Sequence, residues 1–172
     1  GRLHTPRLTL RYFESGDAVS LQAALDIDRG SFLPWLPWVK TDNRSPVESI
    51  FNIERFRRAR ERTRPTPDDF VIGIFDRATG GVAGGTGFHR IKLGAAEAEI
   101  GYWIRPDLRG RGLCTEAVRG MISWGFAEPP AGWGFRRITI YCAGGNAASQ
   151  GVPRKLGLRQ EIHRKGDRWI DE

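Results

Sequence analysis

The stretch from Glu97 to Phe126 constrains the fold of this chain more than any other part of the sequence. It starts with a strand-like segment (Glu97–Ile104) and passes through an arginine- and glycine-rich loop (Arg105–Gly112). It continues as a helix over Leu113–Phe126, where apolar residues recur at helical spacing and form one stripe. A strand, a glycine-rich turn and an amphipathic helix in direct succession predict an α/β domain whose helix packs back on the sheet.

Shorter patterns on both sides of this stretch predict the remaining elements. Apolar runs predict strands at Leu8–Tyr12, Phe70–Phe75, Val82–Arg90 and Arg136–Cys142. Helical spacing and capping residues predict helices at Asp17–Asp28, Ser45–Glu61 and Asn146–Lys155. Turn residues predict a hairpin at Asp76–Gly81, and the last segment, Arg159–Asp171, predicts a strand with a turn at Gly166-Asp167. The prolines and tryptophans of Phe32–Trp38 predict a loop or broken helix, and residues 1–172 are expected to form one domain.

Composition narrows the class of protein. An apolar content of 40% excludes a disordered tail, and a net charge of +7 favours anionic partners, either nucleic acid or phosphorylated small molecules. Two cysteines and three histidines argue against a disulfide scaffold and a zinc site, so no metal is expected. No apolar run approaches the ~20 residues of a membrane span. The sequence opens without Met or a signal peptide and ends at Asp171-Glu172, which suggests trimmed termini and, by default, a cytoplasmic protein.

The loop before the predicted helix has the properties of an anion-binding site. Gly110 and Gly112 lack Cβ atoms, so the backbone can turn sharply and an anion can approach its N–H groups. The free N–H groups and positive dipole end of the helix point to the same place, and Arg109 and Arg111 add charge. The spacing fits neither the P-loop nor the dinucleotide motif. The hypothesis is a pyrophosphate site, and the alternative is an ordinary strand-to-helix turn.

Several motifs in this order resemble the GNAT superfamily of N-acetyltransferases. The coenzyme A loop of that superfamily reads Q/R-x-x-G-x-G/A, and this chain has Arg109-x-x-Gly112-x-Cys114, which departs at the last position. The RimJ/RimL branch, which acetylates ribosomal proteins, is similar in four further motifs: Glu99-Ile-Gly-Tyr-Trp-Ile104, Thr115-Glu-Ala117, Asn146-x-x-Ser149-x-x-Val152-x-x-Lys-Leu-Gly157 and Trp35-Leu-Pro-Trp38. The resemblance implies a single-domain α/β fold with a mixed, mostly antiparallel sheet flanked by helices.

The resemblance also implies acetyl-coenzyme A as co-substrate and a primary amine as acceptor. The residues implied in binding coenzyme A are Tyr102, Trp103, Ile104, Arg109, Gly110, Arg111, Gly112, Leu113, Cys114, Thr115, Asn146 and Lys155. The leading acceptor is the N-terminal amine of a ribosomal or other protein. Polyamines, aminoglycosides and free amino acids remain alternatives, because one fold hosts many substrates. A homodimer is compatible with the sequence.

Acetyl transfer needs a base for the amine and an acid for the leaving thiolate. Glu99, on the strand before the loop, is the first candidate base by resemblance, with Glu97 in reserve and His89 as a weaker alternative. Each could instead be an ordinary strand residue. The resemblance assigns the acid to Ser149, which could instead bond its own helix backbone. Pro153 predicts a kink in that helix.

Three further residues are candidates for the acceptor site, and one charged run suggests other partners. Trp35 and Trp38 could form one wall of an acceptor groove or a core plug, and Cys142 could line the site or lie in the core. Asn146 could both cap its helix and reach the pantetheine amide. The arginines between Arg55 and Arg64 form either a solvated face or a surface for an acidic protein or nucleic acid. The rival classes are a nucleic-acid-binding module, for which no recognition motif is present, and a coenzyme A-binding protein without catalysis.

Overall fold

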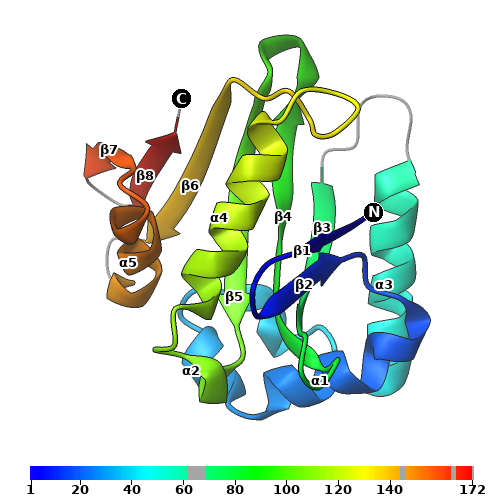
Figure 1. Cartoon of the computed structure of the whole chain (residues 1–172). Helices are drawn as coiled ribbons and strands as arrows, with labels where there is room; N and C mark the ends of the chain where they lie inside the picture. Colours follow the sequence, from blue (N-terminus) through cyan, green and yellow to red (C-terminus); the bar gives the residue numbers. More distant parts are fainter. Residues whose placement is uncertain (62–68, 144–145, 164–165, 172) are drawn as a thin grey trace.

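A computed structural model describes residues 1–61, 69–143, 146–163 and 166–171 of the chain. Its strands form one eight-stranded sheet in the order β1-β2-β3-β4-β5-β6-β8-β7, shown in Figure 1. Neighbouring strands are antiparallel except for β5 and β6. The strands are β1 (Arg2–His4), β2 (Leu8–Arg11), β3 (Asp69–Asp76), β4 (Val82–Lys92), β5 (Glu97–Ile104), β6 (Arg137–Ala143), β7 (Arg159–His163) and β8 (Gly166–Asp171).

The helices divide between the two faces of the sheet. The α-helices are α1 (Ala18–Asp26), α2 (Arg29–Phe32), α3 (Pro46–Glu61), α4 (Leu113–Phe126) and α5 (Ala147–Lys155). Short 3-10 helices are η1 (Ser15–Asp17), η2 (Pro37–Lys40), η3 (Leu93–Ala95) and η4 (Pro106–Leu108). None of the described helices combines the length and the apolar content that crossing a membrane requires.

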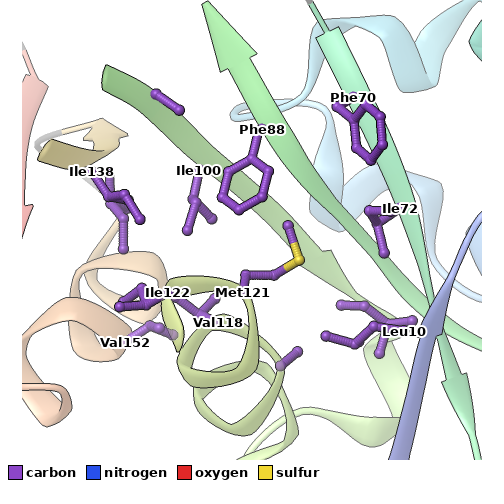
Figure 2. Packing of buried hydrophobic residues seen from close by; sticks show 14 of the residues in the cluster. Leu10, Phe70, Ile72, Phe88, Ile100, Val118, Met121, Ile122, Ile138 and Val152 are labelled. Carbon is purple, nitrogen blue, oxygen red and sulfur yellow. The ribbon is translucent and has the colours of Figure 1, made fainter. Parts of the chain in front are cut away.

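The main hydrophobic core forms where the apolar stripe of α4 packs on the sheet. Val118 and Met121 are fully buried and, as Figure 2 shows, meet strand side chains such as Phe88 and Ile100. A second cluster on the opposite face joins α1, α2 and α3 through residues such as Leu25, and Trp103 packs against it. Residues of β5 therefore contribute to both cores, Ile100 to the first and Trp103 to the second.

The predicted elements around the loop are confirmed. β5 and α4 have the bounds expected from the sequence, and the broken helix at Phe32–Trp38 appears as the end of α2 followed by η2. The helix start at Pro46 is also confirmed: Ser45 Oγ accepts the Glu48 N–H at 3.1 Å. The sequence analysis did not predict β1.

The prediction for Arg159–Asp171 was wrong about the position of the turn. Gly166 and Asp167 lie inside β8, where Gly166 pairs with Ala143 and Asp167 pairs with both Cys142 and His163. The segment forms two strands, β7 and β8, because β8 is inserted between β6 and β7 and is hydrogen-bonded on both sides. A turn inside β8 would have broken both ladders.

The parallel strands β5 and β6 separate toward their carboxyl ends and leave an opening between them. The strands pair only from Glu97–Ile100 to Arg137–Ile140, and beyond these residues they diverge (Figure 1). The N-termini of α4 and α5 follow these two carboxyl ends. The opening therefore lies beside the predicted anion-binding loop, which is the place where carboxyl ends of parallel strands commonly form ligand sites.

Candidate active site

The loop after β5 has the backbone geometry of an anion site. Gly110 and Gly112 adopt left-handed conformations, with φ of 76° and 73°. Among the described residues, no acceptor is bonded to the backbone N–H groups of Gly110, Arg111, Gly112, Leu113 or Thr115. These amides lie at the positive end of the α4 dipole, so they can bind the pyrophosphate of coenzyme A.

Contacts from the N-terminal segment hold this loop in place. Arg7 donates to the Arg111 carbonyl at 2.9 Å and forms an ion pair of 2.7 Å with Glu116. Thr5 Oγ1 donates to the same carboxylate at 2.6 Å. Burial raises the pKa of Glu116, but the hydrogen bonds from Thr5 and Arg7 outweigh it and hold the pKa below its ordinary value. The first turn of α4 is therefore fixed by residues about one hundred positions earlier in the chain.

A groove of about 430 Å³ runs from this loop to α5, and we call it the loop groove. It is lined by every residue expected to bind coenzyme A except Arg111, whose side chain is exposed. Arg109 turns toward α2, where it donates to Ser31 Oγ at 2.9 Å and stacks on Phe32. Trp35 and Ser149 also line the loop groove.

One proline explains how α5 is tied to the sheet. Pro153 lies inside α5 and has no N–H, so the Ser149 carbonyl lacks its helical donor. The Tyr102 hydroxyl donates to that carbonyl at 2.6 Å and thereby links β5 to α5 across the opening. Asn146 caps the helix by accepting the Ser149 N–H at 3.2 Å. Among the described residues the Ser149 hydroxyl has no hydrogen-bond partner, so it is not bonded back to the helix.

A second groove of about 350 Å³ is also lined by Trp103, and we call it the aromatic groove. The two grooves share three lining residues, which are Leu36, Tyr102 and Trp103. Phe13, Trp38 and Phe56 form aromatic walls, while the lining backbone at Gly85 and Gly101 has no side chains. The two tryptophans expected in one acceptor wall are thus divided: Trp35 lines the loop groove and Trp38 the aromatic groove.

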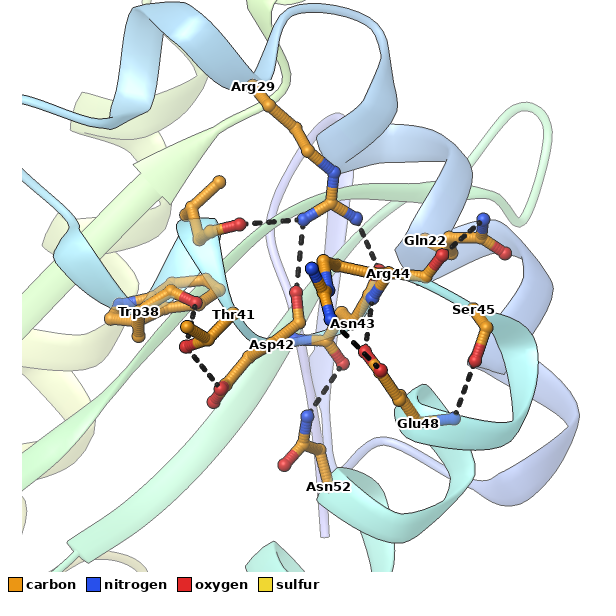
Figure 3. A network of polar contacts seen from close by, with 11 residues as sticks. Gln22, Arg29, Trp38, Thr41, Asp42, Asn43, Arg44, Ser45, Glu48 and Asn52 are labelled. Carbon is orange, nitrogen blue, oxygen red and sulfur yellow. Dashed lines mark hydrogen bonds and ion pairs between the residues drawn. The ribbon is translucent and has the colours of Figure 1, made fainter.

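Arg29 fixes the segment that carries Trp38. Its guanidinium donates to the carbonyls of Val39 at 2.9 Å and Asp42 at 3.0 Å, and also to that of Asn43 (Figure 3). Asn43 is buried and has a left-handed φ of 57°. These contacts give the proline-rich segment one fixed course along the aromatic groove.

The carboxylates expected to act as base lie outside both grooves. Glu99 forms a two-pronged ion pair with Arg90, at 2.9 and 3.1 Å, and it lines neither groove. Glu97 contacts Lys92 at 4.0 Å and lines neither groove. The weaker alternative, His89, does line the aromatic groove.

His89 has a partner that the sequence analysis did not identify. Its Nδ1 lies 2.9 Å from Asp69 Oδ1 on β3, and Asp69 lines the same groove. The signal was present in the predicted hairpin: continuing the β3–β4 pairing outward from the Asp76–Gly81 turn places Asp69 opposite His89. A bulge at Ile74/Phe75 shifts the register, so counting residues alone would have missed the pair.

The remaining predicted residues are placed as follows. The Cys142 side chain, Arg62 and Arg64 lie outside what the structure describes. The described arginines of α3 contact groups of this chain: Arg55 pairs with Asp42, Arg57 with Glu54 and Glu61, Arg58 with Glu54, and Arg60 stacks on Tyr12. The two arginines beside Glu54 hold its pKa at about 2.

Comparison with known proteins agrees with this geometry. A family model described as "Acetyltransferase (GNAT) domain" matches residues 7–159. In Bacillus subtilis, YdaF, provisionally named a ribosomal N-acetyltransferase, is 34% identical over 82 residues, which cover 48% of this chain and 43% of YdaF. YoaA, an uncharacterized N-acetyltransferase of the same organism, is 28% identical over 160 residues, covering 92% of this chain and 83% of YoaA. The chain thus spans less than half the length of YdaF.

Solved structures establish the fold. RimL, the ribosomal L7/L12 alpha-N-protein acetyltransferase in complex with coenzyme A, superposes with a TM-score of 0.83 at 18% identity, covering 99% of this chain and 97% of RimL. The microcin C7 self-immunity acetyltransferase MccE, in complex with acetyl-coenzyme A and AMP, gives a TM-score of 0.81 at 18% identity, covering 97% and 93%. The family match spans most of the chain, and the chain therefore belongs to the GNAT acetyltransferase family, whose members use acetyl-coenzyme A as acetyl donor.

Proposed function

We propose that this protein transfers the acetyl group of acetyl-coenzyme A to the N-terminal amine of a protein, with one domain holding both substrates. The observation that carries the proposal is the junction of the two grooves at Leu36, Tyr102 and Trp103. A donor in the loop groove and an acceptor in the aromatic groove would meet at these residues. Holding two reactants together in this way supplies a large part of the rate enhancement of a transfer reaction.

The loop groove would hold the donor through backbone groups. The free amides of residues 110–113 and 115 would bind the pyrophosphate, as argued above. Beyond Ile100, β5 no longer pairs with β6, and Trp103 and Ile104 line the loop groove, where the pantetheine arm would lie against them. When bound, acetyl-coenzyme A supplies a thioester whose carbonyl carbon is the electrophile.

In this proposal Ser149 protonates the departing sulfur. Its position in the loop groove supports the role, and so does its hydroxyl, to which no described residue is hydrogen-bonded. Glu99 would reach the amine only through water, because Arg90 binds its carboxylate and it lies outside both grooves.

The aromatic groove supports an acceptor with apolar groups beside its amine. Its walls are built from Phe13, Trp38 and Phe56, and it contains the carboxylates of Asp42 and Asp69. The aromatic walls suit the apolar side chains of an extended peptide, and the two carboxylates suit its N-terminal ammonium. The names of YdaF and RimL, which refer to ribosomal substrates, point the same way.

The test is an acceptor panel. The protein is incubated with acetyl-coenzyme A and one acceptor at a time: peptides with free N-termini, the same peptides with blocked N-termini, polyamines, aminoglycosides and amino acids. Thiol release and the mass of the product are measured. We expect release with free N-terminal peptides and none with the blocked ones. Turnover confined to small amines, or absent throughout, would overturn the proposed acceptor.

A further inference from the structure

His89 lies in a row of side chains that crosses the sheet. It pairs with Asp69 on β3 and with Glu99 on β5, so all three project from the same face. The next row toward the groove junction is Val71, Gly87 and Gly101. Two of its three positions are glycine, so the imidazole has open backbone beside it rather than side chains.

The hydrogen bond to Asp69 fixes the protonation of the imidazole. A carboxylate can only accept, so the hydrogen between Asp69 Oδ1 and His89 Nδ1 belongs to the ring. The hydrogen bond from His89 also holds the pKa of the Asp69 carboxyl below its ordinary value, so it stays ionised. With Nδ1 protonated, neutral His89 carries its lone pair on Nε2.

The Nε2 atom lies over the glycine row. A Cβ atom on Gly87 would lie 3.3 Å from His89 Nε2, and one on Gly101 would lie 3.4 Å from it. The His89 side chain is 32% exposed, and it lines the aromatic groove together with Tyr102 and Trp103, which also line the loop groove. The lone pair is therefore presented within the groove that leads to the junction.

Glu99 is the contrasting case in the same row. Its carboxylate is 17% exposed, both of its oxygens are bound by Arg90, and it is absent from the lining of the aromatic groove. Arg90 follows His89 in the chain and has a left-handed φ of 48°, at the point where the β4–β5 register is irregular. Its guanidinium contacts the Glu99 carboxylate. Arg90 therefore holds the Glu99 carboxylate, whereas His89 lines the groove.

We propose that His89 is the catalytic base of this acetyltransferase and that Asp69 is its positioning residue; the inference rests on the proposed function. His89 Nε2 accepts one proton from the acceptor ammonium. The freed nitrogen lone pair forms the C–N bond to the acetyl carbonyl carbon, and the C–S bond breaks with its electron pair leaving on sulfur. A second proton of the nitrogen passes to that sulfur, through Ser149. His89 then releases its proton to solvent, which balances the reaction.

The main test compares His89→Gln with the wild type. Loss of a general base costs roughly 100-fold or more, so kcat should fall by at least ~100-fold while coenzyme A affinity stays unchanged. His4→Gln is the matched control, because His4 lies on β1 at the far edge of the sheet and bonds only Thr9 among the described residues. An unchanged kcat in folded His89→Gln would overturn the proposal, and a loss confined to Glu99→Gln would assign the base to Glu99.

The pH profile of Asp69→Asn tests the pair without removing the imidazole. The charged groups around His89 are Asp69 on β3, Arg90 beside it, Glu99 on β5, and Asp42 and Arg55 across the groove. Removing the Asp69 charge disfavours the imidazolium, so the acidic limb of the kcat/KM profile should move to lower pH. If Asp69→Asn is active and the acidic limb of its profile stays at the wild-type pH, Asp69 is not a positioning residue for His89. Thiol release by the wild type tests the proposed function separately, so failure of the two ideas can be distinguished.

Discussion

The loop groove and the aromatic groove share three residues but are built in opposite ways. In the proposal the loop groove binds the donor through backbone amides of one short segment, Gly110 to Thr115, whose turn depends on two glycines and a helix start. The aromatic groove is assembled from side chains of α1, α3, β3, β4, β5 and the segments that follow β2 and α2. The first depends on local sequence and the second on how distant elements pack. Donor binding should therefore tolerate changes outside its loop better than acceptor chemistry tolerates changes in packing.

After His89→Gln, the next largest effect is expected at Ser149, which lines the loop groove. Ser149→Ala should lower kcat by ~10- to 100-fold, about 1.4 to 2.7 kcal/mol of transition-state stabilisation, with little change in KM for acetyl-coenzyme A. The hydroxyl matters once charge develops on sulfur, so ground-state binding is spared. Steady-state kinetics measure both constants. Ser123→Ala, at an exposed serine of α4, is the control, and normal turnover of Ser149→Ala would remove the acid role.

Gly112→Val tests whether the backbone of the loop carries donor binding. The left-handed φ of 73° is unfavourable for a branched residue, and the side chain would stand where the pyrophosphate approaches. We expect coenzyme A affinity to fall by at least ~10-fold, about 1.4 kcal/mol, in a folded protein. Calorimetry measures the affinity.

Gly80→Val is matched to this change, because Gly80 has the same φ of 73° in the β3–β4 turn and nothing within 4 Å of an added Cβ. It should carry the same backbone strain without any loss of affinity. Equal losses in the two variants would show that strain, rather than the anion site, explains the result.

Tyr102→Phe tests the link between β5 and α5. Removing the donor leaves the Ser149 carbonyl unsatisfied and should destabilise the fold by roughly 1 to 2 kcal/mol. Pro153→Ala restores a helical N–H to that carbonyl, so Tyr102→Phe should cost less in the Pro153→Ala background. A double-mutant cycle measured by denaturant unfolding gives the coupling. If the changes in unfolding free energy for Tyr102→Phe and Pro153→Ala were additive, the hydrogen bond from Tyr102 would not compensate for the N–H that Pro153 lacks.

Glu116→Gln tests the anchor of the loop. The folded-state pKa of Glu116 lies below the ordinary 4.5, so its stabilisation is present above pH 4.5 and is lost as the pH falls through the folded value. We expect the variant to lose up to about 1 kcal/mol of stability at pH 7, with a smaller difference from wild type in acid. Thermal unfolding at several pH values measures this, with Glu128→Gln at an exposed site as control. If the stability difference between wild type and Glu116→Gln became larger in acid, the pKa of Glu116 would not be lowered in the folded state.

Sequence reasoning succeeded where a site is contiguous. The bounds of β5 and α4, the glycine turn and the cap at Asn146 depend on residues near one another in the chain, and the structure confirms them. Spacing along the chain does not decide whether the side chain of a candidate base is free. Glu99 has a suitable position along β5, but whether its carboxylate is free depends on Arg90, which reaches it through an irregular hairpin.

Local sequence patterns were sufficient to predict the fold class and the glycine turn at residues 110–112, because hydrophobic period, turn residues and helix caps act over a few positions. Tertiary structure decided which titratable groups meet. The pairing of His89 with Asp69 needs the β3–β4 register with its bulge, and the bond from Tyr102 to Ser149 needs α5 to dock beside the open end of β5. Side chains so far apart in sequence come within 3 Å only after the sheet and its covering helices have formed, so no local pattern can specify their contact.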